Sequence, residues 1–392
     1  MDLDSLRALL TPGGQAALQI ASALEPREVD FLRHFQQLSR VIPEELARPA
    51  LEVAILRREA AVKFPSPERL YLTRQALEQA SPWQVASYRA ERYKPYGLLA
   101  DLGCSIGGDT LALAEIALVV GVDNDPLRLE MARANLNGQN MGERARFVNA
   151  DLTYPLPFRL DPNAAIFFDP ARRSGGRRLR SVRQYQPTLE VVKTWSESCP
   201  ALGVKVSPGV QLHELDDYEA EIEFISLGGD LKEAVLWFGP LKTASRRATI
   251  LPGAHSLVAE SERVLPVGEP GAYLYEPDPS VLRSGLVACL GARLEATQLD
   301  PDIAYLTSNK LQPTPFARAW AVMDWFPFNL KKLRAYLRER GIGHVTVKKR
   351  GSPLQPEDLI RDLRLKGDGE CVVFLTHLLG KPIIVLASPK PV

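Results

Sequence analysis

The sequence predicts an α/β protein with a mostly parallel sheet at its centre, a helical part before it and a small α+β unit after it. Between residues 97 and 257, short apolar runs alternate with helical windows, which is typical of βαβ units. Residues 1–95 instead place apolar side chains three and four positions apart. Residues 319–392 follow the order βαβαββ. We therefore expect four parts: 1–95, 96–257, 258–318 as a connecting extension, and 319–392.

The helical part is interrupted where proline and glycine gather. Breaks are expected at Pro12–Gly14, Pro43 and Pro65–Pro67. Between them, EVDFLRHFQQLSRV and PEELARPALEVAILRREAAVKF each carry an apolar stripe at helical spacing. LYLTRQALEQAS lies just ahead of the sheet, and Thr73 in it either caps a helix or contacts a ligand.

Five short apolar runs predict the strands of the parallel sheet: GLLADLGC, ALVVGVD, RARFVNAD, AAIFFDP and LGVKVSP. Two β-rich runs, AEIEFISLGG and EAVLWFGP, then suggest an edge hairpin that closes the sheet. The extension that follows is rich in proline and glycine. We expect one helix in it, from Ser280 to about Arg293, because Pro279 and Ser280 are start signals.

The C-terminal unit begins with the strand-like run AWAVMDWF and the amphipathic helix NLKKLRAYLRER, with Asn329 as cap and Gly341 as stop. Two final strands are expected to join at Gly380–Lys381. This unit holds 13 Lys/Arg and 7 Asp/Glu, a net charge of +6, whereas the rest holds 35 and 40, a net of −5. Such asymmetry predicts a basic module that meets nucleic acid, or alternatively a solvated basic surface.

Composition excludes several classes of protein. With 45% hydrophobic and 24% charged residues, the chain is a globular protein and not a disordered one. The four cysteines form no CxxC pair and the five histidines show no ligand spacing, so we expect no metal site and no disulfide framework. No secretory signal and no long apolar run is evident, which predicts a cytoplasmic protein without a membrane partner.

The strongest motif is LLADLGCSIGGDT, a glycine turn between a strand and a helix. Asp101 ends the strand, and Gly103 and Gly107 follow; such a turn lets a ligand approach the backbone and a helix N-terminus. Asp123 ends the next strand, where an acid can accept both ribose hydroxyls of a nucleoside. The pattern predicts a site for an adenosine-containing ligand. Two neighbouring residues are also candidates for contacting this ligand. Asn124 follows Asp123, and Cys104 is either a ligand contact or a small core residue.

The residues also favour one ligand over another. A dinucleotide fingerprint would have its middle glycine at Ser105, where a serine places a Cβ close to the pyrophosphate. Asp101 would repel that pyrophosphate but suits a cation. S-adenosylmethionine carries a sulfonium and an ammonium and has no phosphate. It therefore fits a glycine turn between two acids, Asp101 and Asp123, better than a dinucleotide does.

With these motifs, the sequence resembles the class I S-adenosylmethionine-dependent methyltransferases. DLGCSIGGDT looks like their E/DxGxGxG cofactor motif, Asp123 like their second-strand acid, and VNADLTYP like their third motif. The resemblance covers about residues 97–257 and implies a Rossmann-like sheet, with Asp151 placed for the adenine amino group. It is similar in particular to a bacterial group that carries a C-terminal THUMP-like domain, which residues 319–392 fit in length and order of elements. THUMP domains are RNA-binding modules.

FFDPARR occupies the position of the family's D/N-P-P-aromatic motif, at the tip of a strand. There Asp169 is expected to orient the methyl acceptor through a hydrogen bond, and Pro170 to fix the loop. Arg172 and Arg173 are expected to hold an adjacent phosphate, as the first of six arginines within twelve residues. The alternatives are a solvated basic loop and pairing with acids of the N-terminal helices.

Weaker candidates are Tyr185 for base stacking, Lys205 and Ser207 for the same cleft, and the basic run Lys348–Arg350 for phosphate. Together these residues predict a methyltransferase that modifies RNA, either rRNA or tRNA. Because Ala171 and Arg172 replace the second proline and the aromatic residue of the motif, two alternatives stay open. One is a protein or small-molecule substrate, and the other is a non-catalytic protein that binds cofactor and RNA.

Overall fold

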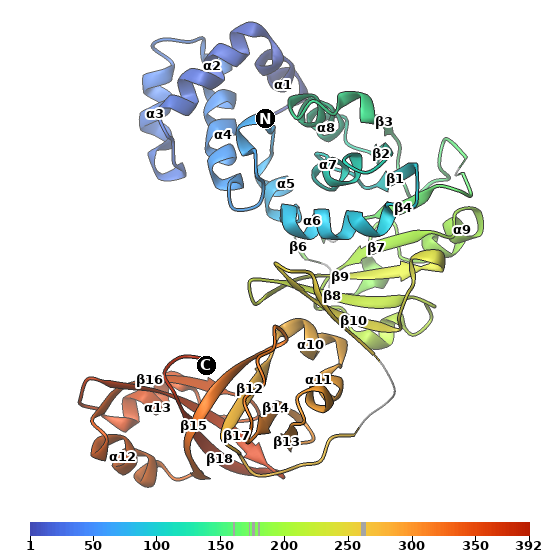
Figure 1. Cartoon of the computed structure of the whole chain (residues 1–392). Coiled ribbons are helices and arrows are strands. Elements are labelled where there is room, and N and C mark those ends of the chain that lie inside the picture. The colour runs from blue at the N-terminus through green and yellow to red at the C-terminus, as the bar shows by residue number, and fades with distance from the viewer. Residues whose placement is uncertain (160, 172, 175–176, 179–180, 260–263) are drawn as a thin grey trace. The chain divides into compact units, whose positions relative to one another are not determined.

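The computed structural model describes the whole chain apart from residues 160, 172, 175–176, 179–180 and 260–263 (Figure 1). The chain divides into two compact units. The first unit comprises Met1–Ile222 and Lys232–Thr243, and the second comprises Glu223–Leu231 and Ala244–Val392.

The first unit begins with helices, as the apolar spacing predicted. Each helix starts where the sequence offers a capping group or a proline: the side chains of Asp2, Thr11 and Thr73 each accept a backbone N–H at a helix start. Thr73 is therefore a cap. The helices are α1 (Leu3–Leu10), α2 (Pro12–Ala23), α3 (Phe31–Leu38), α4 (Glu44–Ala60), α5 (Arg74–Gln79) and α6 (Trp83–Ala90).

The sheet of the first unit is the parallel α/β sheet that the alternating pattern predicted. Its strands lie in the order β3-β2-β1-β4-β7-β9, and they are parallel except for β9, which runs antiparallel to β7. The strands are β1 (Leu98–Leu102), β2 (Leu118–Asp123), β3 (Ala145–Asn149), β4 (Ala165–Phe168), β7 (Leu202–Val206) and β9 (Asp230–Phe238). The helices among them are α7 (Gly108–Ala114), α8 (Pro126–Gly138) and α9 (Val191–Ser198).

Strand order reverses at β1, because β2 lies on one side of it and β4 on the other. Leu102 at the end of β1 is in register with Phe168 at the end of β4. The loops that leave these two strands therefore start side by side at the carboxyl edge of the sheet, which is where ligands bind in open α/β sheets. A two-residue pair, β5 (Arg173–Ser174) with β6 (Arg177–Arg178), follows β4.

The second unit contains most of β8 (Glu221–Leu227), the antiparallel pair β10 (Arg246–Leu251) and β11 (His255–Val258), and a seven-stranded sheet. The sheet order is β13-β14-β12-β15-β18-β17-β16. Its strands are β12 (Tyr273–Pro277), β13 (Thr297–Asp300), β14 (Ile303–Ser308), β15 (Ala317–Pro327), β16 (Ile342–Lys349), β17 (Gly369–Leu378) and β18 (Lys381–Ala387).

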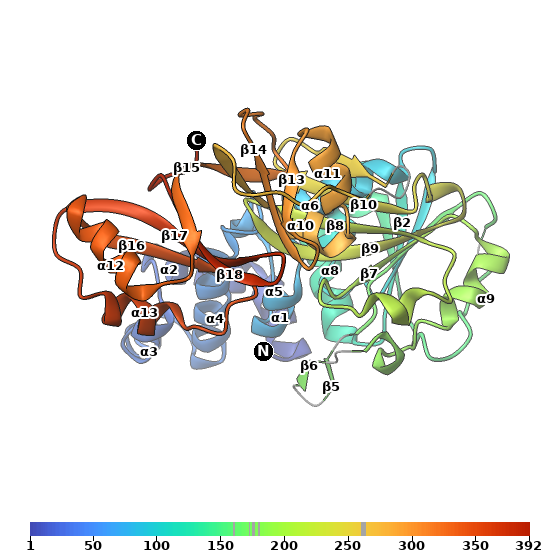
Figure 2. The ribbon, with the colours of Figure 1, turned by 90° about the horizontal axis from the view of Figure 1, so that it is seen from below.

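Residues 317–387 follow the predicted order βαβαββ, with α12 (Leu330–Glu339) and α13 (Pro356–Leu363) as the helices. Both helices cover one face of β16, β17 and β18, and leucines from α12 and α13 share a core with Val373 and Ile384 (Figures 1 and 2). The turn between β17 and β18 is formed by Leu379 and Gly380, both with positive φ. It lies one residue earlier than predicted.

Residues 258–318 differ from the expected extension with a single helix. Gly285, with φ +73°, ends α10 (Pro279–Ser284) and separates it from α11 (Val287–Arg293). The same segment also supplies β12, β13 and β14, and β12 pairs directly with β15. These strands are four to six residues long and lie among prolines and glycines, so their alternation is too short to stand out in the sequence. No helix in the described part of the chain is long and apolar enough to cross a membrane.

Candidate active site

The glycine turn after β1 has the backbone geometry that the motif requires. Gly103 and Gly107 have φ of +81° and +80°, and Gly107 precedes the first residue of α7. A Cβ at Gly103 would lie 2.6 Å from the backbone carbonyl oxygen of Asp169, so only glycine permits this approach between the loops of β1 and β4. Ser105 also has a positive φ, +51°, and its N–H donates to Asp123 Oδ2 at 2.9 Å.

Asp123 lies at the end of β2 and is buried. Besides accepting from Ser105, its Oδ1 accepts the N–H of Asp125 at 3.0 Å, so the carboxylate fixes the loops on both sides. A carboxylate has about four acceptor positions, which leaves about two for the hydroxyls of a ligand. Burial raises the pKa of Asp123. Its neighbour Asn124 is exposed at the same strand end.

Asp101 is fully buried at the end of β1. Its Oδ2 accepts the hydroxyl of Thr110, while Oδ1 has no hydrogen-bond partner among the described residues. Burial, and next the negative charge of Asp109, raise the pKa of Asp101 to about 8. This carboxyl is therefore mostly protonated at neutral pH, and a cation placed beside it would favour the charged form.

Cys104 and Asp151 occupy different surroundings. The Cys104 thiol is buried against Gly121 of β2, and this burial raises its pKa, so the thiol is neutral. Asp151 is exposed, and its Oδ1 accepts the backbone N–H and the hydroxyl of Thr153, which together lower its pKa. Asp151 lies just beyond Ala150, whose N–H donates to the carbonyl of Asp123. Cofactor contacts by Cys104 and Asp151 stay predictions.

Asp169 follows β4 directly, and its N–H donates to the carbonyl of Leu102, which extends the pairing with β1 by one residue. Its carboxylate accepts a hydrogen bond from Lys205 Nζ at 2.7 Å. Lys205 lies in β7, only 3% of its side chain is exposed, and its Nζ is also 3.7 Å from Asp109 Oδ2. The structure thus joins Asp169 to Lys205, which the sequence indicated only weakly.

A chain of alternating charges continues inward from Lys205. Arg89 of α6 pairs with both Asp109 at the start of α7 and Glu233 of β9, and its guanidinium lies 4.3 Å from the ring centroid of Phe167. We refer to Asp169, Lys205, Asp109, Arg89 and Glu233 as the charge chain. Sequence patterns did not identify Asp109, Arg89 and Glu233 as residues of this site. Asp109 lies within the glycine motif, so its position was a usable signal.

Besides Arg89, a second contact connects the helical N-terminal part to the glycine turn. Asn135 of α8 is buried, accepts the N–H of Tyr71 at 2.6 Å and donates to the carbonyl of Ile106 at 2.9 Å. Ile106 lies inside the glycine turn. One amide side chain therefore connects the segment before α5 to the loop that follows β1.

The loop after Asp169 is joined to a later segment by backbone hydrogen bonds. Pro170 is buried, and Ala171 exchanges backbone hydrogen bonds with Gln186. Arg172 lies outside the described residues, and Arg173 is described by its backbone alone, in β5. Both roles stay predictions. Tyr185 is buried and its hydroxyl accepts the N–H of Ser207, so it belongs to the core and not to a stacking surface.

The basic run Lys348–Arg350 in the second unit is engaged within the protein. Lys348 Nζ lies 2.6 Å from a carboxylate oxygen of Glu276, and Lys349 donates to Gln355. Among the described residues, no group of three or more His, Cys, Asp or Glu side chains could hold a metal ion.

Comparison with known proteins gives two family matches. Residues 317–389 match the family described as THUMP domain-like. Residues 2–60 match a domain of unknown function (DUF8688).

The chain is 35% identical over 339 residues to an uncharacterized S-adenosylmethionine-dependent methyltransferase of Mycobacterium tuberculosis CDC 1551, and equally to one of strain H37Rv. Each match covers 84% of this chain and 92% of the relative. Among solved structures, the chain is similar to a proposed methyltransferase from Porphyromonas gingivalis W83, with a TM-score of 0.71 and 18% identity. That match covers 93% of this chain and 99% of the other.

Proposed function

This chain belongs to the S-adenosylmethionine-dependent methyltransferases, and from that premise we propose that it methylates RNA, with rRNA and tRNA as the expected classes. The observation that carries the proposal is the THUMP-like domain at residues 317–389, because THUMP domains are RNA-binding modules. Its basic charge fits a polyanionic partner. On α12, Lys331, Lys332 and Arg338 are exposed, and contacts from such side chains to phosphate are independent of sequence.

The cofactor, S-adenosylmethionine, supplies a methyl group activated on a positively charged sulfur. Two features of the edge support the assignment of its site. The unpartnered, buried Oδ1 of Asp101 is an acceptor suited to a cation, and the left-handed glycines at 103 and 107 keep the backbone free of side chains. Asp123 retains acceptor capacity for ribose hydroxyls. In this proposal Asp101, Gly103, Gly107 and Asp123 hold the cofactor.

The acceptor side of the proposal centres on Asp169. About a fifth of its side chain is exposed (21%), so it can meet a substrate, while Lys205 fixes one of its oxygens. A carboxylate held in this way accepts a hydrogen bond from the attacking group and aligns its lone pair. Lys205 is a positioning residue in this scheme, because it acts through Asp169. Pro170 would fix the loop at that point, and Arg172 and Arg173 would hold an adjacent phosphate.

Methyl incorporation from labelled cofactor tests the substrate class directly. Purified full-length protein is incubated with total RNA, with total protein and with a small-molecule extract from the same cells. We expect label in the RNA fraction that ribonuclease removes, and loss of that label with Asp169→Ala. Label in protein alone, resistant to ribonuclease, would contradict the RNA assignment and support the protein substrate.

A further inference from the structure

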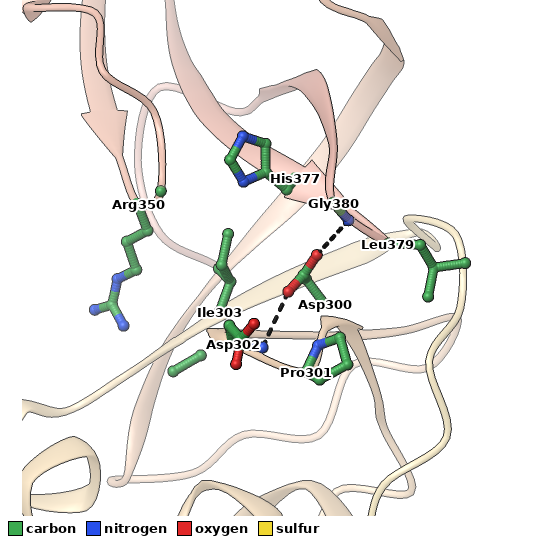
Figure 3. A pocket seen from close by; sticks show the side chains of 10 residues that line it. Asp300, Pro301, Asp302, Ile303, Arg350, His377, Leu379 and Gly380 are labelled. Carbon is green, nitrogen blue, oxygen red and sulfur yellow. Dashed lines mark hydrogen bonds between the residues drawn. The ribbon is translucent and has the colours of Figure 1, made fainter.

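The second unit contains a hollow of about 580 Å³ whose lining includes none of the residues proposed to bind the cofactor or to orient the methyl acceptor. It lies where three loops meet: the turn between β13 and β14, the end of β16 and the turn between β17 and β18 (Figure 3). Its volume falls within the range of about 300–1,000 Å³ that is typical of small-molecule sites. The hollow combines residues of the segment before β15 with residues of the THUMP-like domain.

One buried carboxylate fixes the walls of the hollow. Asp300 Oδ1 accepts the N–H of Asp302 at 3.0 Å, and Oδ2 accepts the N–H of Gly380 at 2.7 Å (Figure 3). Two turns that lie 80 residues apart in sequence are thereby held together. Asp300 is engaged in holding the turns, and the hollow is formed before any ligand arrives.

Gly351 leaves room for two side chains that line the hollow. Gly351 has φ +80°, and a Cβ there would lie 2.7 Å from Ile303 Cδ1 and 3.0 Å from His377 Nδ1. The aliphatic side chain of Ile303 and the imidazole of His377 therefore lie next to bare backbone. Ile303 thus provides an apolar surface in the hollow, and His377 provides a flat ring beside it.

Two polar side chains of the lining have no protein partner. Neither the imidazole of His377 nor the carboxylate of Asp302 makes a hydrogen bond or ion pair within the described chain. Arg350 lies in the wall with its guanidinium 4.9 Å from the ring centroid of Tyr305 and 3.8 Å from Glu276. Figure 3 shows these side chains coming from three separate segments.

The mixture of groups selects a class of ligand. Asp302 would repel a polyphosphate, and its acceptor-only carboxylate matches an exocyclic amino group. The imidazole plane of His377 suits the face of an unstacked base, and single-stranded RNA offers such bases. We propose that this hollow binds one unstacked RNA base that carries an amino group. The inference rests on the proposed RNA substrate and adds a base preference to it.

Binding of labelled, short homopolymers of cytidine, adenosine and uridine to the full-length protein, measured by fluorescence anisotropy, tests the inference. We expect the cytidine and adenosine polymers to bind about tenfold more tightly than the uridine polymer, since uracil lacks an amino group. Asp302→Asn should remove this discrimination, because an amide both donates and accepts. His377→Ala should weaken binding of all three about tenfold through lost stacking. Matched controls are Asp368→Asn and His344→Ala, two exposed positions in the same unit.

Each outcome decides a different question. If the wild type binds all three polymers alike, or if both variants behave as their controls, the base site is wrong and the RNA substrate stands. If no polymer binds at any salt concentration, the RNA substrate and the base site both fail. If cytidine 5′-monophosphate alone binds with the same dependence on Asp302 and His377 while no polymer does, the hollow takes a free nucleotide and not RNA.

Discussion

The two polar sites of this molecule are built in opposite ways. In the first unit, Arg89 and Lys205 are buried, each with 3% of its side chain exposed, and both pair with Asp109, whose side chain is 12% exposed. In the second unit, Asp302 and His377 face the hollow without a partner in the described chain. Paired buried charges fix geometry, and removal of one leaves another uncompensated. Unpartnered polar groups at a surface are available to a ligand and contribute little to folding.

The sharpest test of this contrast is removal of the cation at the centre of the charge chain. Arg89→Leu leaves Asp109 and Glu233 buried without their shared partner. We expect the free energy of unfolding to fall by about 3–5 kcal/mol, as measured by urea denaturation. Arg74→Leu is the matched control, since that guanidinium also pairs with two acids but is 46% exposed; it should cost less than about 1 kcal/mol. Equal losses of unfolding free energy in the two variants would show that burial of the charges does not determine the cost of removing the arginine.

Asp169, at the exposed end of the charge chain, tests catalysis directly. Asp169→Ala should lower the single-turnover methylation rate about a hundredfold, the usual effect of one well-placed catalytic hydrogen bond, with little change in RNA affinity. Asp161→Ala, an exposed position ahead of β4, is the control. A wild-type rate in Asp169→Ala would remove this residue from the reaction.

Asp101 provides a prediction about pH. Its pKa is raised to about 8 in the folded chain, against roughly 3.9 when unfolded. Between these values the folded state holds a proton that the unfolded state has lost, so stability falls as pH rises from about 4 to 8 and levels off on either side. Asp101→Asn should flatten that fall in urea titrations.

The same carboxyl should respond to the cofactor. In the proposed site, the cation favours the charged form of Asp101, so cofactor binding at pH 7 should release about one proton in the wild type and none in Asp101→Asn. Calorimetry in buffers of different ionisation enthalpy measures this number. Binding without proton release in the wild type would place the cation elsewhere.

The smallest expected effect concerns the arginines after Pro170. Arg172→Ala and Arg173→Ala should each lower the salt dependence of RNA binding by about one phosphate contact and leave the reaction rate at saturating RNA unchanged. Filter binding across a salt series measures the slope, with the exposed Arg144→Ala as control. An unaltered slope in both variants would assign these arginines to solvent or to acids of the protein.

Local patterns made much of the first unit predictable. The glycine turn, Asp101, Asp123 and Asp169 all lie at strand ends, and a short window of sequence is enough to find them. The pairing of Arg89 with Glu233 could not be found in that way, because Glu233 is 144 residues distant and only the folded sheet brings it to α6. Lys205 was only a weak candidate in the sequence, because its pairing with Asp169 depends on the neighbouring strand β4.

The second unit was predictable where its elements are long. The order βαβαββ was read correctly, whereas β12, β13 and β14 were missed because few alternating positions fit into four to six residues. The expected boundary at residue 318 stays a prediction, and β12 pairs with β15 across it. Removal of residues 319–392 would open that sheet, so single substitutions in the intact chain are the better tests of RNA docking.

Strand β18 has a consequence for the synthesis of the protein. It is the strand nearest the C-terminus, yet it lies between β15 and β17 and pairs with both. Until it leaves the ribosome, the sheet exists as two separate pieces, each with an open hydrogen-bonding edge that invites pairing with another chain. A premature stop at residue 381 would therefore leave a protein whose C-terminal sheet remains in two halves, a substrate for chaperones and proteases.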